Sequence, residues 1–240
     1  YYLSPFLTNH PTTRFLAPEI TNQKFLSLPD PLPVRDSSGQ PVALFIHPDE
    51  RWVFDQAQQI YPGAKFEVLT GPKPDGSSGG PPSVFFVRLE PADLMSVRGL
   101  DLRYLPTSEE DPMLAALLAP LHTSRANGIN VVWPEDSPTD KEFVAEWGGI
   151  LYAPQYGPYG FRLISPAGSK LEIDGNVVLE GTGEQSTGLT LAQGNHSLRV
   201  EAEGAPGEVV LYWQPPGAPE QQVPAWALYT RPVTNHGLLG

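Results

Sequence analysis

The feature that most constrains this fold is a rhythm of short apolar stretches in the second half of the chain. From Asn130 onward, stretches such as FVAEWGGILYA (residues 143–153), SKLEID (residues 169–174) and HSLRVEA (residues 196–202) recur every ~8–12 residues. Turn residues separate nearly all of them. Short strands at this spacing are typical of antiparallel sheets, so this half predicts an antiparallel sandwich or barrel.

One turn within this rhythm carries an unusually clear signal. In KLEIDGNVVL (residues 170–179), the pair Asp174-Gly175 stands between two alternating runs. A type I′ hairpin turn needs a positive φ angle at both central residues, and the Asp-Gly pair adopts it readily. Turn formation therefore accounts for Asp174, and a role of its carboxylate in ligand binding is the alternative.

The first part of the chain has a different pattern. VALFIH (residues 42–47) is a continuous apolar run, which predicts a strand buried on both faces. Residues 48–63 begin with Pro-Asp, end with Pro-Gly and carry apolar residues at helical spacing, which predicts a helix. Two further strands are expected at residues 64–70 and 83–91, with a loop at residues 71–82 between them. This order predicts a small α/β domain over residues 1–97.

Two short helices are also expected. Asn9 and Pro11 can begin one that runs to Leu16. Residues 107–120 predict the second, because Ser108 resembles the start of a capping box and a proline ends the run.

Composition excludes several classes of partner. The chain has 240 residues and a net charge of −12, without a Lys/Arg cluster, which argues against nucleic acid and anionic membrane surfaces. It has no cysteine, so disulfides, thiolate catalysis and cysteine-bound zinc are excluded. No apolar run approaches the ~20 residues of a membrane helix. Because the chain begins at Tyr1 rather than Met, we expect a piece of a longer protein, with residues 232–240 as a linker toward a further domain.

Motifs for catalysis are weak. Residues 76–80 match Gly-x-Ser-x-Gly, but a nucleophile elbow needs a strand before the serine and a helix after it, whereas prolines flank this segment. We interpret it as a linker. No Asp-x-Asp occurs for a nucleotide sugar. Paired carboxylates of a glycoside hydrolase stay open, because their spacing is spatial. No catalytic residue is assigned, and the enzymatic status of the piece is left uncertain, with non-catalytic preferred.

Metal and anion sites are equally sparse. The five histidines show no pair at ligand spacing, so neither a metal nor a cofactor is predicted. Asp136 and Asp140 offer the alternative of a calcium site, although acids in such loops are usually solvated. The best local cluster is His47, Asp49 and Arg51, where a strand leads into a helix. An anion or polar ligand at this helix start is one interpretation; helix capping is the other.

Four motifs in order resemble a known family. They are FVAEWGGILYAPQYGPYGFRL (residues 143–163), KLEIDGNVVL (residues 170–179), TGLTLAQGNHSLRVEAEG (residues 187–204) and VVLYWQPPGAPEQQVPAWALY (residues 209–229). Together they resemble the anthrax protective-antigen (PA-fourteen) domain family, over residues 99–230. The resemblance implies a jelly-roll-type β-sandwich of the kind found in toxins, glycosidases, glycosyltransferases and adhesins, many of which bind carbohydrate.

The resemblance also implies where a sugar would bind, and this sequence departs from it there. Fungal adhesins of the family hold sugar through calcium, which two neighbouring aspartates coordinate just before the Ile-Asp-Gly hairpin. This chain has Pro166 and Ala167 at that place. Calcium needs six to eight oxygen ligands, several of them carboxylates, so calcium-dependent binding is not expected. Aromatic side chains could stack on a sugar ring. Tyr156 and Tyr159 flank a turn, so we expect both to be partly exposed, whereas Trp147 and Trp213 are expected in the core.

A second, shorter resemblance concerns residues 1–90. YLSPF and HPTTRFL are similar to the segment that follows the membrane helices of bacterial protein-mannosyltransferase-like glycosyltransferases. This implies an extracytoplasmic location, a membrane-embedded parent and a polyprenyl-linked sugar or another glycan as partner.

The sequence therefore predicts an α+β protein of two domains. A small α/β domain spans residues 1–97, and an antiparallel jelly-roll-type sandwich spans residues 98–231. The preferred function is a non-catalytic extracytoplasmic region of a bacterial membrane glycosyltransferase that positions or recognises glycan. The alternatives are a carbohydrate-binding module of a secreted glycosidase or adhesin, and a structural spacer. Candidate sugar-binding residues are Tyr156, Tyr159 and Asp174.

Overall fold

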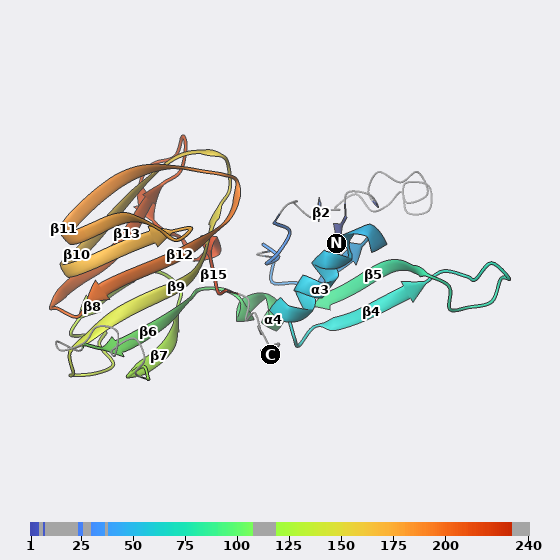
Figure 1. The fold of residues 1–240 in the computed structure, drawn as a ribbon, viewed down its shortest axis with the longest axis horizontal. Helices are drawn as coiled ribbons and strands as arrows, with labels where there is room; N and C mark the ends of the chain where they lie inside the picture. Colours follow the sequence, from blue (N-terminus) through green and yellow to red (C-terminus); the bar gives the residue numbers. More distant parts are fainter. Residues whose placement is uncertain (5–6, 8–23, 26–29, 37, 108–118, 232–240) are drawn as a thin grey trace, which may run out of the picture. The chain divides into compact units, whose positions relative to one another are not determined.

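The computed structural model describes residues 1–4, 7, 24–25, 30–36, 38–107 and 119–231. These divide into two compact units, residues 1–97 and residues 98–231 (Figure 1). The two expected short helices and the expected linker at residues 232–240 lie largely or wholly outside the described residues. The predicted class, an α+β chain with an antiparallel jelly-roll-type sandwich, is confirmed.

The first unit is a five-stranded sheet with short helices. Its strands lie in the order β2-β1-β3-β5-β4. Both β3 and β4 pair antiparallel with β5, which lies between them, so β3 and β4 run parallel and helix α3 connects them. The bounds are β1 (Tyr2–Leu3), β2 (Lys24–Phe25), β3 (Val42–Ile46), η1 (Pro48–Glu50), α3 (Arg51–Ile60), β4 (Lys65–Thr70), β5 (Pro82–Leu89) and α4 (Pro91–Ser96).

Strand β3 corrects one expectation. Leu44 and Ile46 are fully buried, but Ala43 and Phe45 between them are only half-buried. The strand is therefore fully buried on one face only. On that face, helix α3 supplies buried apolar residues, among them Phe54, whose ring centroid lies 4.8 Å from that of Phe85.

The second unit is a sandwich of curled antiparallel strands. Its main path is β14-β13-β10-β12-β9-β6-β7, and β11, β15 and β8 pair with β10, β9 and β13. Figure 1 shows the long strands β10 and β11 curling side by side. The bounds are β6 (Leu100–Pro106), β7 (His122–Ala126), β8 (Asn130–Trp133), β9 (Phe143–Ala153), β10 (Gly157–Ile173), β11 (Asn176–Leu191), β12 (Gly194–Glu203), β13 (Gly207–Gln214), β14 (Gln221–Gln222), η2 (Ala225–Ala227) and β15 (Leu228–Tyr229).

Strand β10 changes partner halfway along its 17 residues. Residues 160–164 pair with β13, and residues 169–173 pair with β12. A β-bulge between Ser165 and Ser169 separates the two halves. Bulges bend a strand, so this segment serves as the corner at which β10 passes from one set of partners to the other.

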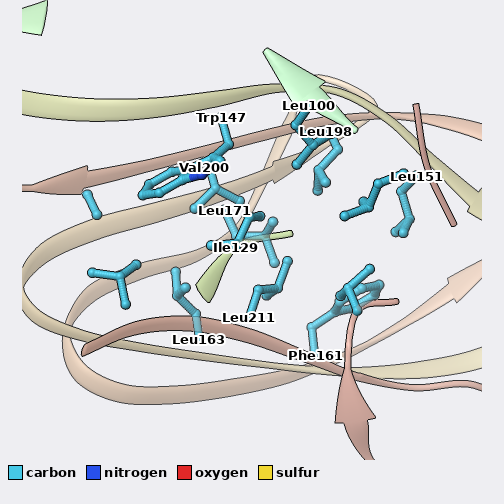
Figure 2. Packing of buried hydrophobic residues seen from close by; sticks show 14 of the residues in the cluster. Leu100, Ile129, Trp147, Leu151, Phe161, Leu163, Leu171, Leu198, Val200 and Leu211 are labelled. Atoms are coloured by element: carbon cyan, nitrogen blue, oxygen red, sulfur yellow. The ribbon is translucent and has the colours of Figure 1, made fainter. Parts of the chain in front are cut away.

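The core lies between the inward faces of these strands. Trp147 and Trp213 are fully buried, so their expected place in the core is confirmed. Figure 2 shows Trp147 near Leu171 and Val200, with Leu163 on the other side of the packed layer. Alternate residues of β9, β10 and β12 supply this layer, which leaves the residues between them on the opposite face of the sheet.

Candidate functional site

Asp174 forms the expected turn and also ties that turn to a third strand. Its φ angle is 52° and that of Gly175 is 75°, as a type I′ turn requires. The Oδ1 atom accepts a hydrogen bond from Ser197 N at 2.9 Å, and Oδ2 lies 2.6 Å from Nδ1 of the nearly buried His196. His196 Nε2 donates to Ala192 O at 2.9 Å. The sequence did not indicate this contact between Asp174 and His196.

The two candidate tyrosines differ. Tyr156 is 74 % exposed between β9 and β10. Tyr159 is fully buried, so the expectation that it is partly exposed is wrong. Its ring stacks on Phe161, and its hydroxyl donates to Gln155 O at 2.9 Å. Burial raises the pKa of Tyr159. Its ring faces are therefore taken by the core rather than open to a sugar.

The cluster of His47, Asp49 and Arg51 at the start of η1 has local partners. His47 caps the segment, because its Nδ1 accepts from Asp49 N at 3.3 Å. Arg51 lies 3.4 Å from Asp55, four residues along α3. These contacts supply the capping interpretation with its geometry, and the anion site at this place stays a prediction.

The segment at which the resemblance placed a calcium site is the β-bulge. Ser165 is buried there, and Gly168 N donates to Glu203 Oε2 at 3.2 Å. Asp136, the other calcium candidate, accepts from Val132 N at 2.7 Å and shapes a turn. Among the residues described, no group of three or more His, Asp or Glu side chains could hold a metal ion.

A network of charged side chains covers the outward face of the sheet opposite the core. At its centre, Glu146 on β9 is nearly buried. Arg103 on β6 donates to its Oε1 at 3.1 Å, and Arg199 on β12 donates to its Oε2 at 2.9 and 2.6 Å. Burial alone would raise the pKa of Glu146, but the hydrogen bonds from the two guanidinium groups outweigh it and hold that pKa below its ordinary value.

The network continues onto β10. Lys170 lies 2.5 Å from Glu172 and 3.8 Å from Glu201, and Arg199 lies 3.6 Å from Glu172. The hydrogen bond from Lys170 lowers the pKa of Glu172. We call six residues the charged face: Arg103, Glu146, Lys170, Glu172, Arg199 and Glu201.

The strand register arranges the charged face in two rows that cross five strands. Each row takes one residue from β10, β12, β9, β6 and β7 in turn. The first row is Lys170, Glu201, Glu146, Arg103 and Thr123, and the second is Glu172, Arg199, Gly148, Asp101 and Arg125. Three hollows of about 610, 570 and 400 Å³ are lined in part by residues of these rows. The rows present fixed donors and acceptors beside open space, which suits a ligand rich in hydroxyl or charged oxygen groups.

The sequence did not reveal this face, because its acids lie in three separate strands rather than in one motif. Glu146, Glu172 and Glu201 all lie within strands. Their signal was the alternation of charged with apolar residues in KLEI and LRVEA. That alternation predicts a solvent-facing side, but the pairing of five strands, which brings the charges together, is not visible in it.

The chain matches the family model described as PA14 domain over residues 104–225. Solved structures to which this chain is similar include an anti-sigma factor domain-containing protein from Clostridium clariflavum (22% identity, 56% of this chain and 48% of that one, TM-score 0.48). Others are the Epithelial Adhesin 9 A domain from Candida glabrata, in complex with Galb1-3GlcNAc (11%, 57% and 91%, 0.47), and a PA14 sugar-binding domain from an RTX adhesin (18%, 56% and 99%, 0.44). The chain spans about half the length of the anti-sigma factor proteins it matches. Comparison with curated proteins gave no match.

These comparisons separate the two resemblances. They give no support to the likeness of residues 1–90 to a mannosyltransferase tail. In the part of the chain that the structure describes, no helix is both long and apolar enough to span a membrane. The matched family model covers half of the chain, and nearly all of its sandwich unit. The chain therefore belongs to the PA14 domain family.

Proposed function

We propose that this chain is a non-catalytic, extracellular carbohydrate-binding module that recognises glycan through the charged face. The observation that carries the proposal is the match to the PA14 family over residues 104–225, because carbohydrate binding is what the resemblance to that family implied. The PA14 domain of the RTX adhesin is described as sugar-binding, which agrees with the proposal.

Geometry supports the charged face as the site. Sugar hydroxyl groups donate and accept hydrogen bonds, and the two rows offer guanidinium donors beside carboxylate acceptors. Strand pairing and mutual ion pairs already hold these side chains, so little conformational entropy remains to be lost on binding. The β-bulge, by contrast, offers no carboxylate of its own at Pro166 and Ala167. We therefore propose recognition that needs no calcium.

The comparisons also bear on the kind of protein to which such a module would belong. A module of a secreted glycosidase or adhesin agrees with the relatives found, which include a beta-glucosidase from Kluyveromyces marxianus and an RTX adhesin. The membrane glycosyltransferase, with its polyprenyl-linked sugar, has no comparable support. A structural spacer is the remaining alternative, and it makes the opposite prediction about binding.

The test is a glycan array probed with the 240-residue chain, with and without EDTA, followed by calorimetric titration of any hit. Binding that persists in EDTA is expected. Glu172→Gln, which removes one charge from the charged face, should weaken binding about tenfold. The matched control Glu208→Gln lies on β13, outside both rows, and should bind as wild type. Absence of binding to every glycan would contradict the proposal and favour the spacer, and equal affinity of both variants would remove the site from the charged face.

A further inference from the structure

Two adjacent glycines in the middle of β9 have different reasons to be glycine. A Cβ atom on Gly149 would lie 2.5 Å from both the Tyr229 carbonyl oxygen and a methyl carbon of Leu100. Close packing therefore explains Gly149. A Cβ atom on Gly148 would meet nothing within 4 Å, and its φ angle lies outside the left-handed region. Neither packing nor backbone conformation explains Gly148.

A glycine inside a strand weakens that strand, and it often marks a place where a ligand approaches the backbone closely. The space above Gly148 fits this interpretation. Gly148 is the one residue of the second row without a side chain, between Arg199 on β12 and Asp101 on β6. It forms part of the lining of a hollow of about 610 Å³. We call this hollow the Gly148 pocket.

The Gly148 pocket is rich in arginine. Its charged lining consists of Arg103, Arg125, Arg199, Arg231, Asp101 and Glu146, and Thr123 and Ser124 add hydroxyl groups. Four guanidinium groups therefore face two carboxylates, in a chain whose net charge is −12. The lining therefore holds more guanidinium groups than carboxylates, although Arg199 also pairs with Glu172 and Glu201, which lie outside the lining.

The two carboxylates of the pocket are already engaged. Arg103 and Arg199 hold both oxygens of Glu146, and Asp101 lies 3.6 Å from Arg125. Arg231 is anchored at the rim by a hydrogen bond of 3.5 Å from its Nε to Gly149 O. Within the described residues, Nη1 of Arg103 and both Nη atoms of Arg231 make no hydrogen bond. These nitrogens are donors without an acceptor beside open space.

We propose that the Gly148 pocket binds the oxyanion of an acidic sugar, a carboxylate or a sulfate ester. Guanidinium groups recognise such planar or tetrahedral anions through paired, charge-assisted hydrogen bonds. The missing side chain at Gly148 lets the anion settle against β9 between the flanking strands. The sugar part of this inference rests on the proposed function, since neighbouring residues of the charged face would bind the hydroxyl groups. The anion part does not depend on it.

The test titrates the 240-residue chain with glucuronic acid, glucose and sodium sulfate by calorimetry. Glucuronate should bind at least about tenfold more tightly than glucose, and added salt should weaken it. Gly148→Val places a side chain in the pocket without removing a charge, so it should reduce glucuronate affinity at least about tenfold and should not lower the melting temperature. Gly188→Val is the matched control, because Gly188 is an exposed strand glycine of β11 whose Cβ atom would also have room.

The three titrations and the glycan array together distinguish failure of this inference from failure of the proposed function. Glucuronate and sulfate binding no tighter than glucose, or Gly148→Val binding glucuronate as wild type does, would overturn the pocket, while the glycan array still decides carbohydrate binding. Sulfate and glucuronate binding equally, with no neutral glycan bound, would support the pocket as an anion site and contradict the sugar. Arg231→Gln provides a second variant at an exposed position, and it should lower anion affinity severalfold with no loss of melting temperature. Unchanged affinity in that variant would also count against the proposal.

Discussion

The two faces of the β10–β12–β9–β6 sheet are built from alternate residues of the same strands, yet they differ in what explains them. On the inner face, Trp147 and Val200 are fully buried in a packed core. On the outer face, Glu146 and Arg199 form ion pairs beside an open hollow. Folding alone accounts for the inner face. The outer face combines costly buried charge with unfilled space, which points to a role in binding.

The largest effect expected from this comparison is at the centre of the inner face. Trp147→Ala removes a fully buried side chain and leaves a cavity, so the free energy of unfolding should fall by about 3–5 kcal/mol. Urea unfolding followed by circular dichroism measures it. Tyr156→Ala, at an exposed position, is the control and should stay within about 0.5 kcal/mol of wild type. A similar loss in both variants would break the distinction between core and surface.

A smaller loss is expected where β9 meets its neighbours closely. Gly149→Ala places a methyl group against the backbone of Tyr229. The strands must move apart, at a cost of about 1–3 kcal/mol in the free energy of unfolding. The same substitution at Gly148 should cost nothing. Thermal unfolding of the two variants side by side checks this, and equal melting temperatures would show that the two glycines do not differ.

The ion pairs of Glu146 should make the stability of the protein depend on pH. Its folded pKa lies below the ordinary value, so its contribution to stability is complete above the unfolded pKa of about 4.3. That contribution is lost as the pH falls from there through the folded pKa. Glu146→Gln should therefore lower stability by about 1–2 kcal/mol at neutral pH and flatten the acid limb of the profile. Urea midpoints measured from neutral to acidic pH test it; parallel profiles would contradict the assignment.

The smallest expected change in stability has the opposite sign. Gly148→Val replaces a strand glycine with a residue that favours strands, in a place with room for its side chain. The free energy of unfolding should rise by about 0.5–1 kcal/mol. Differential scanning calorimetry can resolve a rise of this size. A clear loss of stability would mean that Gly148 has a structural reason after all.

Much of the fold could be predicted because its signals are local. The Asp-Gly turn at residues 174–175 needs only two residues to define it, and the buried Trp147 and Trp213 lie in strands that alternate. The burial of strand β3 was harder to predict. A continuous apolar run does not reveal that one face of the strand is fully buried and the other only half-buried.

The site could be predicted less well, because its residues are joined only by strand register. Tyr159 flanks a turn in the sequence, but alternation along β10 places it inside with Phe161. Glu146, Arg103 and Arg199 come from three strands distant in the chain, and nothing local announces their contact. The vacant space above Gly148 depends on side chains from two neighbouring strands, so no single stretch of sequence could show it.

The most direct test of the account is an NMR titration of the isotope-labelled 240-residue chain with glucuronic acid. If the outer face binds acidic sugar, the amide signals of Gly148 and of residues beside it on β6 and β12 should shift most, and those of the β-bulge at residues 165–168 should not. Shifts confined to the bulge, or no shifts at any concentration, would contradict the claim that the outer face is the binding face.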